Sequence, residues 1–305
     1  MMKVGKNNAT ILFSVITIVN LAIFFYRDKS TYHKYATRSS LYSADTLKWK
    51  KLIYDYPKQE LNEAKLVLDS LVDLENKSTS SKILEIGKLL YERFHKQQGR
   101  PSSTVARATP LNHFRILNSS TSERLWCGDF AAMFVFFCWS EGIPCRVVEL
   151  SNPGNHHVLN ECYLPESREW VLADVTTNHL LLFNKNRNSF ENLLNLKDAL
   201  WDSLQSFQVE GREIVTRSFM PGFYEKYFGH ENPIYYYYRI NNFQISKNSE
   251  KIKRYFLPIV WYEEVNKTPM SNFRFYARQF FIVLWFFCLI FLAKQFLATG
   301  KIKKL

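Results

Sequence analysis

The sequence has few of the residues that mark the specialised classes of protein. It holds only 10 glycines and 10 prolines among 305 residues, which excludes a collagen-like chain. Five cysteines are too few for a disulfide framework, and their odd number leaves at least one thiol free. Because 47% of the residues are apolar and 16% are aromatic, the chain is not disordered. Its length fits one large domain or two small ones.

The sequence also lacks the common cofactor motifs. There is no Cys-x-x-Cys or His-x-x-x-His spacing, so a zinc site is not expected. There is no glycine-rich phosphate-binding loop either. We therefore expect no cofactor and no metal.

The net charge of +12 is concentrated at the two ends of the chain. Half of this excess comes from six lysines close to the termini: Lys3, Lys6, Lys294, Lys301, Lys303 and Lys304. A nucleic-acid-binding protein would instead carry the excess on its folded domain. We therefore expect no nucleic-acid partner.

An apolar segment follows the basic N-terminal tail, residues 1–9. No charged residue lies between Lys6 and Arg27, and 20 residues in a helix cross a hydrocarbon core of about 30 Å, so we place a candidate transmembrane helix at 10–26. A cleaved signal peptide is the alternative. The segment ends in Phe24-Phe25-Tyr26 rather than in the small residues of a cleavage site, which favours an uncleaved transmembrane helix.

A second apolar segment covers 279–298, before the basic tail 299–305. It is uncharged as far as Lys294, whose side chain would have to reach the membrane interface. A buried core helix is the alternative. Residues 280–287 are apolar on every face, which favours a second transmembrane helix. The lipid bilayer is thus the expected partner, contacted through two helices.

Two spans would place both tails on the same side of the membrane. The connecting segment of about 250 residues contributes little to orientation, so the short basic tails should determine it. We expect both tails in the cytoplasm and the globular domain on the non-cytoplasmic side.

The middle of the chain predicts an α+β domain. Apolar residues recur at helical spacing over 58–75 and 80–96, and a polar stretch with two prolines, 97–122, is expected to be a loop. Residues 127–141 are apolar nearly all round, which predicts a buried central helix. Strands are expected over 145–150, 157–164 and 170–175, the last two forming a hairpin. We assign 46–180 to a core and 181–278 to an aromatic-rich extension, in which 200–275 has no clear pattern.

Three residues of this core could perform cysteine catalysis. Cys127 lies at the start of the central helix, where free N–H groups favour a thiolate. His157 opens the first hairpin strand and could act as the base. If the hairpin turn is 165–168, Asp174 lies opposite Leu159 and on the same sheet face as His157. A turn one residue longer would put the two on opposite faces.

In this order, the three residues resemble the transglutaminase-like superfamily. Four blocks carry the resemblance: 127–131 (CGDFA), 142–147 (GIPCRV), 157–163 (HVLNECY) and 170–176 (WVLADVT). The resemblance implies a papain-like fold, in which N-terminal helices and a central cysteine helix pack on an antiparallel sheet. It also implies a nucleophile at Cys127, a base at His157 and an orienting acid at Asp174.

The resemblance further implies acyl chemistry on a thiol. Cys127 would attack an amide or ester, and the acyl-enzyme would pass to water or to an amine. An alternative is a catalytically inactive copy of the fold that serves as a membrane-tethered binding or assembly module in envelope or glycan biogenesis. A third hypothesis is a protease facing the cytosol.

Each site residue has a simpler interpretation. Cys127 could be a structural thiol, Asp174 could bind the backbone at a strand end, and His156 competes with His157. Asp129 is expected to complement the helix dipole. His113 and Asn118 are conceivable oxyanion donors in the preceding loop.

Structural interactions are also expected between residues of the strands. Arg146 is expected to form a structural ion pair, and Glu161 either lines the site or is structural. A disulfide between Cys145 and Cys162 is an option if the domain lies outside the cytoplasm.

Overall fold

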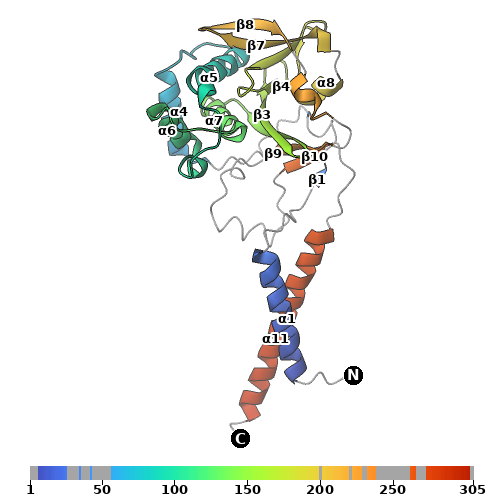
Figure 1. The fold of residues 1–305 in the computed structure, drawn as a ribbon. Helices are drawn as coiled ribbons and strands as arrows, with labels where there is room; N and C mark the ends of the chain where they lie inside the picture. The colour runs from blue at the N-terminus through green and yellow to red at the C-terminus, as the bar shows by residue number, and fades with distance from the viewer. Residues whose placement is uncertain are drawn as a thin grey trace. The chain divides into compact units, whose positions relative to one another are not determined.

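A computed structural model describes residues 6–25, 34–35, 42, 56–198, 201–219, 222–228, 232–237, 262–265 and 273–302. Its elements form two compact units. One contains the terminal helices α1 (Lys6–Phe25) and α11 (Phe273–Ile302), and the other contains the remaining elements (Figure 1).

Four helices pack together in the larger unit (Figure 1): α4 (Lys58–Asp69), α5 (Thr79–Phe94), α6 (Pro110–Ser119) and α7 (Cys127–Ser140). The start of α5 is fixed by Ser78, whose side chain accepts a hydrogen bond from the N–H of Ser81. Every residue of α7 from Phe130 to Cys138 is buried, which confirms the predicted central helix. Helix α4 ends at Asp69, several residues before the predicted end.

The prediction of a loop over 97–122 is wrong for the middle of this stretch, where helix α6 forms. Pro110 had indicated a break, but it occupies the first turn of the helix, where its missing N–H and fixed φ are tolerated. Leu111, Phe114 and Leu117 recur at helical spacing and are buried. The ring of Phe114 packs edge-on against Phe137 of α7, with centroids 5.2 Å apart. Short 3-10 helices, η1 (His95–Gln97) and η2 (Val105–Arg107), precede it.

The larger sheet has the strand order β1-β10-β9-β2-β3-β4. Its strands are β1 (Lys34–Tyr35), β10 (Tyr262–Val265), β9 (Ile234–Tyr237), β2 (Cys145–Asn152), β3 (Asn155–Leu164) and β4 (Glu169–Ala173). All neighbours are antiparallel except β1 and β10, which are parallel. Leu164 pairs with Glu169, so the hairpin turn is 165–168, as the first of the two predicted registers requires.

The predicted extension, 181–278, supplies more helices and strands than its sequence indicated. A second, antiparallel sheet has the order β6-β5-β7-β8. It consists of β5 (Leu181–Asn184), β6 (Ser189–Phe190), β7 (Leu204–Glu210) and β8 (Glu213–Ser218). The short helices α8 (Leu193–Asp198), η3 (Trp201–Ser203) and α9 (Gly222–Glu225) complete the described elements.

The β2–β3–β4 sheet has an apolar core on each face. Val147, Cys162 and Val171 belong to the cluster that contains α7. Leu159 and Leu172 point the other way, into a cluster that includes aromatic residues of α9 and β9. The strand positions of His157 and Asp174 fall on this second face, because side chains two residues apart share a face.

Arg146 and Glu161 form the expected structural ion pair. The Glu161 carboxylate accepts bonds from Nε of Arg146 at 3.0 Å, from the Tyr42 hydroxyl at 2.8 Å and from the Leu193 N–H at 2.9 Å. The guanidinium also lies 4.1 Å from the centre of the Trp170 ring. Both charges are buried and bonded, so Glu161 supports the sheet through these contacts rather than lining the site.

In the smaller unit, α1 and α11 lie side by side (Figure 1). The Trp285 indole N–H donates to Thr17 Oγ1 at 2.7 Å, and its ring stacks on Phe13 at 5.7 Å. Asn20 donates to the carbonyl of Phe281 at 3.4 Å. Polar side chains of α1 thus meet α11, while Phe287 and other apolar side chains of α11 are exposed.

The two terminal segments differ in how well they fit a membrane span. Within the described residues, one stretch, Tyr276–Lys294 of α11, is long and apolar enough to cross a membrane. The predicted segment 279–298 overlaps it. The apolar stretch of α1, Thr10–Leu21, is shorter than a full span, so two spans remain a prediction.

Candidate active site

The N-terminus of α7 places the candidate nucleophile. Trp126 precedes the helix with an extended backbone, and its N–H donates to Oδ2 of Asp129 at 2.9 Å. The N–H groups of Asp129 and Phe130 bond to the Trp126 carbonyl. This pattern leaves the N–H groups of Cys127 and Gly128 without an intrahelical acceptor. Cys127 is partly accessible, so its sulfur lies at a helix start that favours negative charge.

His157 and Asp174 meet as the hairpin register requires. Nε2 of His157 lies 2.6 Å from Oδ2 of Asp174, and both side chains are buried. Cys127 lies close enough to His157 to raise the pKa of the imidazole. Since Nε2 is occupied by Asp174, Nδ1 is the ring nitrogen left for the thiol. The structure therefore brings all three predicted residues together, with the imidazole in the middle.

The charges of this group favour an imidazolium. Burial alone would lower the pKa of His157, but the Asp174 carboxylate and the contact with Cys127 raise the pKa to about 10. Burial pushes the pKa of Asp174 upward, but the attraction of His157 and three hydrogen bonds bring it below its usual value of 3.8. His157 is therefore protonated at neutral pH and carries a proton that it can transfer.

Aromatic residues of α9 form one side of the site. The Tyr224 hydroxyl donates to Oδ2 of Asp174 at 2.6 Å and contacts the Thr177 hydroxyl at 2.9 Å. The Thr177 N–H donates to the other Asp174 oxygen at 3.3 Å. Phe223 packs edge-on against the His157 ring, with centroids 4.8 Å apart, and is partly exposed. Sequence reasoning missed these residues, for which the only available signal was the aromatic run 219–228.

His179 supports Asp174 through the backbone. The two residues exchange N–H to carbonyl bonds of 2.7 and 2.9 Å. The His179 side chain lies against Phe219 and bonds to Ser206 Oγ at 2.9 Å. Burial lowers the pKa of His179, so this ring is neutral and its contacts are structural.

The other candidates have different partners. His156 is exposed and contacts Glu149 at 2.9 Å, so it does not compete with His157. His113 is buried, and its Nε2 contacts the Val105 carbonyl. Asn118 is exposed and accepts a bond from Arg93. The structure thus gives no support to His113 or Asn118 as oxyanion donors.

Asp129 has the structural role expected of it. Its carboxylate accepts the Trp126 N–H at the helix start, as an acid in a first turn commonly does. Burial raises the pKa of Asp129, and the Trp126 bond and the charge of His113 oppose that rise.

One group of thiols lies apart from this site. Cys138, Cys145 and Cys162 are buried, and their sulfur atoms all lie within 4.8 Å of one another. Among the described residues, they are the one group of three or more cysteine, histidine or acidic side chains close enough to hold a metal ion.

Comparison with known proteins identifies the central segment. Residues 96–175 match the model of the transglutaminase-like superfamily. This segment is thus similar to the transglutaminase-like superfamily. It contains α6, α7 and the β2–β3–β4 hairpins, and with them all three predicted site residues. The resemblance to the transglutaminase-like superfamily is thereby confirmed for this part of the chain.

A solved structure also matches part of the chain. It comes from Cytophaga hutchinsonii and is provisionally described as a cysteine protease. The match has 16% identity and a TM-score of 0.32, and it covers 63% of this chain and 61% of the other. The chain therefore corresponds to less than two thirds of that protein. No curated protein matches the sequence.

Proposed function

We propose that this protein is a membrane-anchored thiol enzyme that hydrolyses or transfers an acyl group held in an amide or ester. One observation carries the proposal: His157 is hydrogen-bonded to Asp174 and lies close enough to the partly accessible Cys127 for the thiol to raise its pKa. A structural histidine would not need a partly accessible thiol as its second partner. The match to the transglutaminase-like superfamily supports the same chemistry at a coarse level.

The proposed reaction follows from this arrangement. The Cys127 thiolate attacks the acyl carbonyl, and the N–H of Cys127 stabilises the oxyanion. The His157 imidazolium then donates its proton to the departing amine or alcohol, leaving an acyl-enzyme. Water or an amine next attacks the thioester, while His157 takes up the proton of this nucleophile. Asp174 holds the ring so that Nδ1 faces the thiol throughout.

We also propose that α1 and α11 anchor the enzyme in a bilayer, with both tails cytoplasmic. The exposed apolar side chains of α11, such as Phe280 and Phe287, would face lipid. The bond from Trp285 to Thr17 would hold α1 beside it, as polar contacts do between membrane helices. Reporter fusions to the C-terminal tail test the orientation: a cytoplasmic reporter should be active and an exported one inactive.

Alkylation of Cys127 tests the site. At pH 6 only about 0.3% of a free cysteine is thiolate, because its pKa is about 8.5. A thiolate paired with the His157 imidazolium should react with iodoacetamide far faster at this pH. We expect His157→Ala to slow the labelling by at least about tenfold. His156→Ala is the matched control, because its ring contacts Glu149 at the surface, and it should label like the wild type.

Equal labelling of His157→Ala and wild type would remove the proposed pair. The inactive binding-module alternative would then lead, because the fold would be present without an activated thiol. Substrate assays separate the remaining outcomes. A panel of p-nitrophenyl esters, with and without hydroxylamine, should show a burst of nitrophenol that Cys127→Ser abolishes. Faster turnover with hydroxylamine would favour transfer to amines, and no effect would favour hydrolysis.

A further inference from the structure

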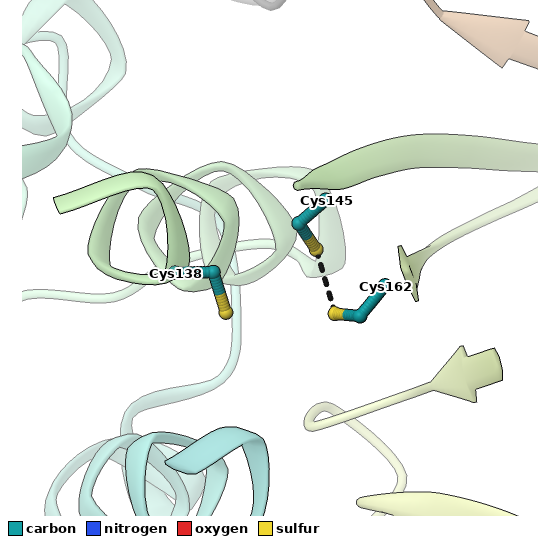
Figure 2. A group of neighbouring side chains, drawn as sticks. All are labelled: Cys138, Cys145 and Cys162. Atoms are coloured by element: carbon teal, nitrogen blue, oxygen red, sulfur yellow. Dashed lines mark hydrogen bonds between the residues drawn. The ribbon is translucent and has the colours of Figure 1, made fainter. Parts of the chain in front are cut away.

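We propose that Cys145 and Cys162 are joined by a disulfide in the mature protein, and that Cys138 remains a buried thiol beside it. The two sulfur atoms point toward each other across neighbouring strands, and Cys138 lies next to them on α7 (Figure 2). Their Sγ atoms are 2.8 Å apart, closer than two non-bonded sulfurs pack. This inference rests on the thiol cluster alone and does not depend on the proposed acyl chemistry.

The sheet register favours this pairing. Cys145 and Cys162 are direct cross-strand partners on β2 and β3. The N–H of Tyr163 donates to the Pro144 carbonyl at 2.8 Å, so the adjacent Cys145–Cys162 pair is a non-hydrogen-bonded one. Such pairs have Cα atoms about 4.5 Å apart, within the range of about 4.4 to 6.8 Å that disulfides span. The backbone therefore already holds the two residues at a bonding separation.

A metal site fits the same thiols less well. Tetrahedral zinc with Zn–S bonds of about 2.3 Å separates its sulfur ligands by about 3.8 Å, more than this pair shows. It also needs a fourth ligand, and the cluster in the described part of the chain offers three. All three cysteines lie in the main apolar core, where a zinc ion with three thiolates would leave a buried net charge of −1.

The chemistry balances with an oxidant of the protein-disulfide class. The thiolate of one cysteine attacks the disulfide of a thiol-oxidising protein and forms a mixed disulfide. The second thiolate then displaces that protein, which leaves as a dithiol with two electrons and two protons from this chain. Both sulfurs are fully buried in the folded domain, so the exchange has to occur before the core closes. Such oxidants act outside the cytoplasm, which places the domain on the non-cytoplasmic side.

Peptide mapping tests the pairing on the full-length chain. Cells are quenched with acid to stop thiol exchange, free thiols are then blocked with N-ethylmaleimide in denaturant at neutral pH, and the purified protein is cut by trypsin and Glu-C. These proteases cut after Arg146, Glu141, Glu161 and Glu166, so Cys145 falls in peptide 142–146 and Cys162 in peptide 162–166. Cys127 and Cys138 share peptide 125–141. The three possible pairings in the cluster therefore give different linked masses.

We expect peptide 142–146 linked to 162–166, with peptide 125–141 carrying two blocking groups. Cys138→Ala should keep the linked pair, and Cys162→Ala should lose it. Three outcomes would overturn the proposal: full blocking of all three thiols, a link that involves 125–141, or stoichiometric zinc or copper in the purified protein. Because the mapping uses wild-type chain, it does not depend on whether a cysteine variant folds. Labelling of Cys127 stays an independent measurement, so either proposal can fail alone.

Discussion

Replacing Asp174 with Asn should change the protonation state of His157 at neutral pH. The carboxylate is the largest of the influences that raise the pKa of His157, against its burial, from 6.5 to about 10. At about 1.4 kcal/mol per pKa unit, the rise in the pKa of His157 corresponds to roughly 5 kcal/mol in favour of the imidazolium. Without the charge, burial dominates, and we expect the pKa of His157 in Asp174→Asn to fall below 6.5.

The assay is an NMR titration of the full chain with isotope-labelled histidine, in which His157→Gln identifies the signal. The wild-type signal should stay in its imidazolium position from pH 5 to 9. The Asp174→Asn signal should be that of a neutral ring at pH 7. Acyl transfer should also fall by about 10³–10⁴-fold, because the amide no longer holds the required protonation state. A wild-type signal that titrates near 6.5 would refute the charged pair.

The same shift predicts how stability depends on pH. Because the folded-state pKa of His157 is raised, its stabilising contribution is complete below pH 6.5 and is lost as the pH rises toward 10. The lowered pKa of Asp174 acts in the opposite direction, so its contribution is present above 3.8 and is lost in acid. Thermal unfolding of Asp174→Asn should therefore lose the dependence on pH between 6.5 and 10, and should instead lose stability as the pH falls below 6.5, because the folded-state pKa of His157 is then below its unfolded value.

Three further substitutions test other parts of the structure. Tyr224→Phe removes a hydrogen bond to the Asp174 carboxylate. The loss should lower kcat/KM by the equivalent of about 1.5–3 kcal/mol of transition-state stabilisation. Tyr227→Phe is the matched control and should change kcat/KM little. Glu161→Gln leaves the Arg146 charge buried and should lower the unfolding free energy by about 3 kcal/mol or more, while Glu210→Gln at the surface should leave it unchanged. Thr17→Val should weaken the association of α1 and α11 peptides in micelles by roughly 0.6 kcal/mol, as seen by energy transfer, with Thr10→Val as control.

Each of these three predictions has an outcome that would contradict it. Equal losses in Tyr224→Phe and Tyr227→Phe would mean that the hydroxyl of Tyr224 does not orient Asp174. A stable Glu161→Gln protein would mean that the rings around Arg146 suffice without the carboxylate. Unchanged association of Thr17→Val would mean that apolar packing alone joins the two helices.

The local parts of the site were predictable from the sequence. Residues 127–141 could only be a buried helix, since they are apolar on every face, and Cys127 had to lie at its start. The two predicted hairpin strands left a turn of 165–168 or one residue longer, which limited Asp174 to two registers. Choosing between those registers needed the structure, because a single extra turn residue reverses the face.

The features that the sequence did not predict depend on contacts between residues far apart in the chain. Tyr224 reaches Asp174 from 50 residues further along the chain, and nothing local in its sequence indicates that partner. Helix α6 was missed for another reason: Pro110 is compatible with both a loop and a helix start, and only the burial of Phe114 decides between them. The cysteine cluster likewise joins α7 to two strands and has no short sequence spacing.

Under the proposed function, the bond between Tyr224 and Asp174 makes α9 part of the smallest active unit. A fragment cut at the end of the transglutaminase-like match, residue 175, would keep Cys127, His157 and Asp174 but would lose the hydroxyl that holds the carboxylate. It would also lose Phe223, which covers one side of the imidazole. Any attempt to transplant the catalytic group into another protein would therefore have to carry α9 with it.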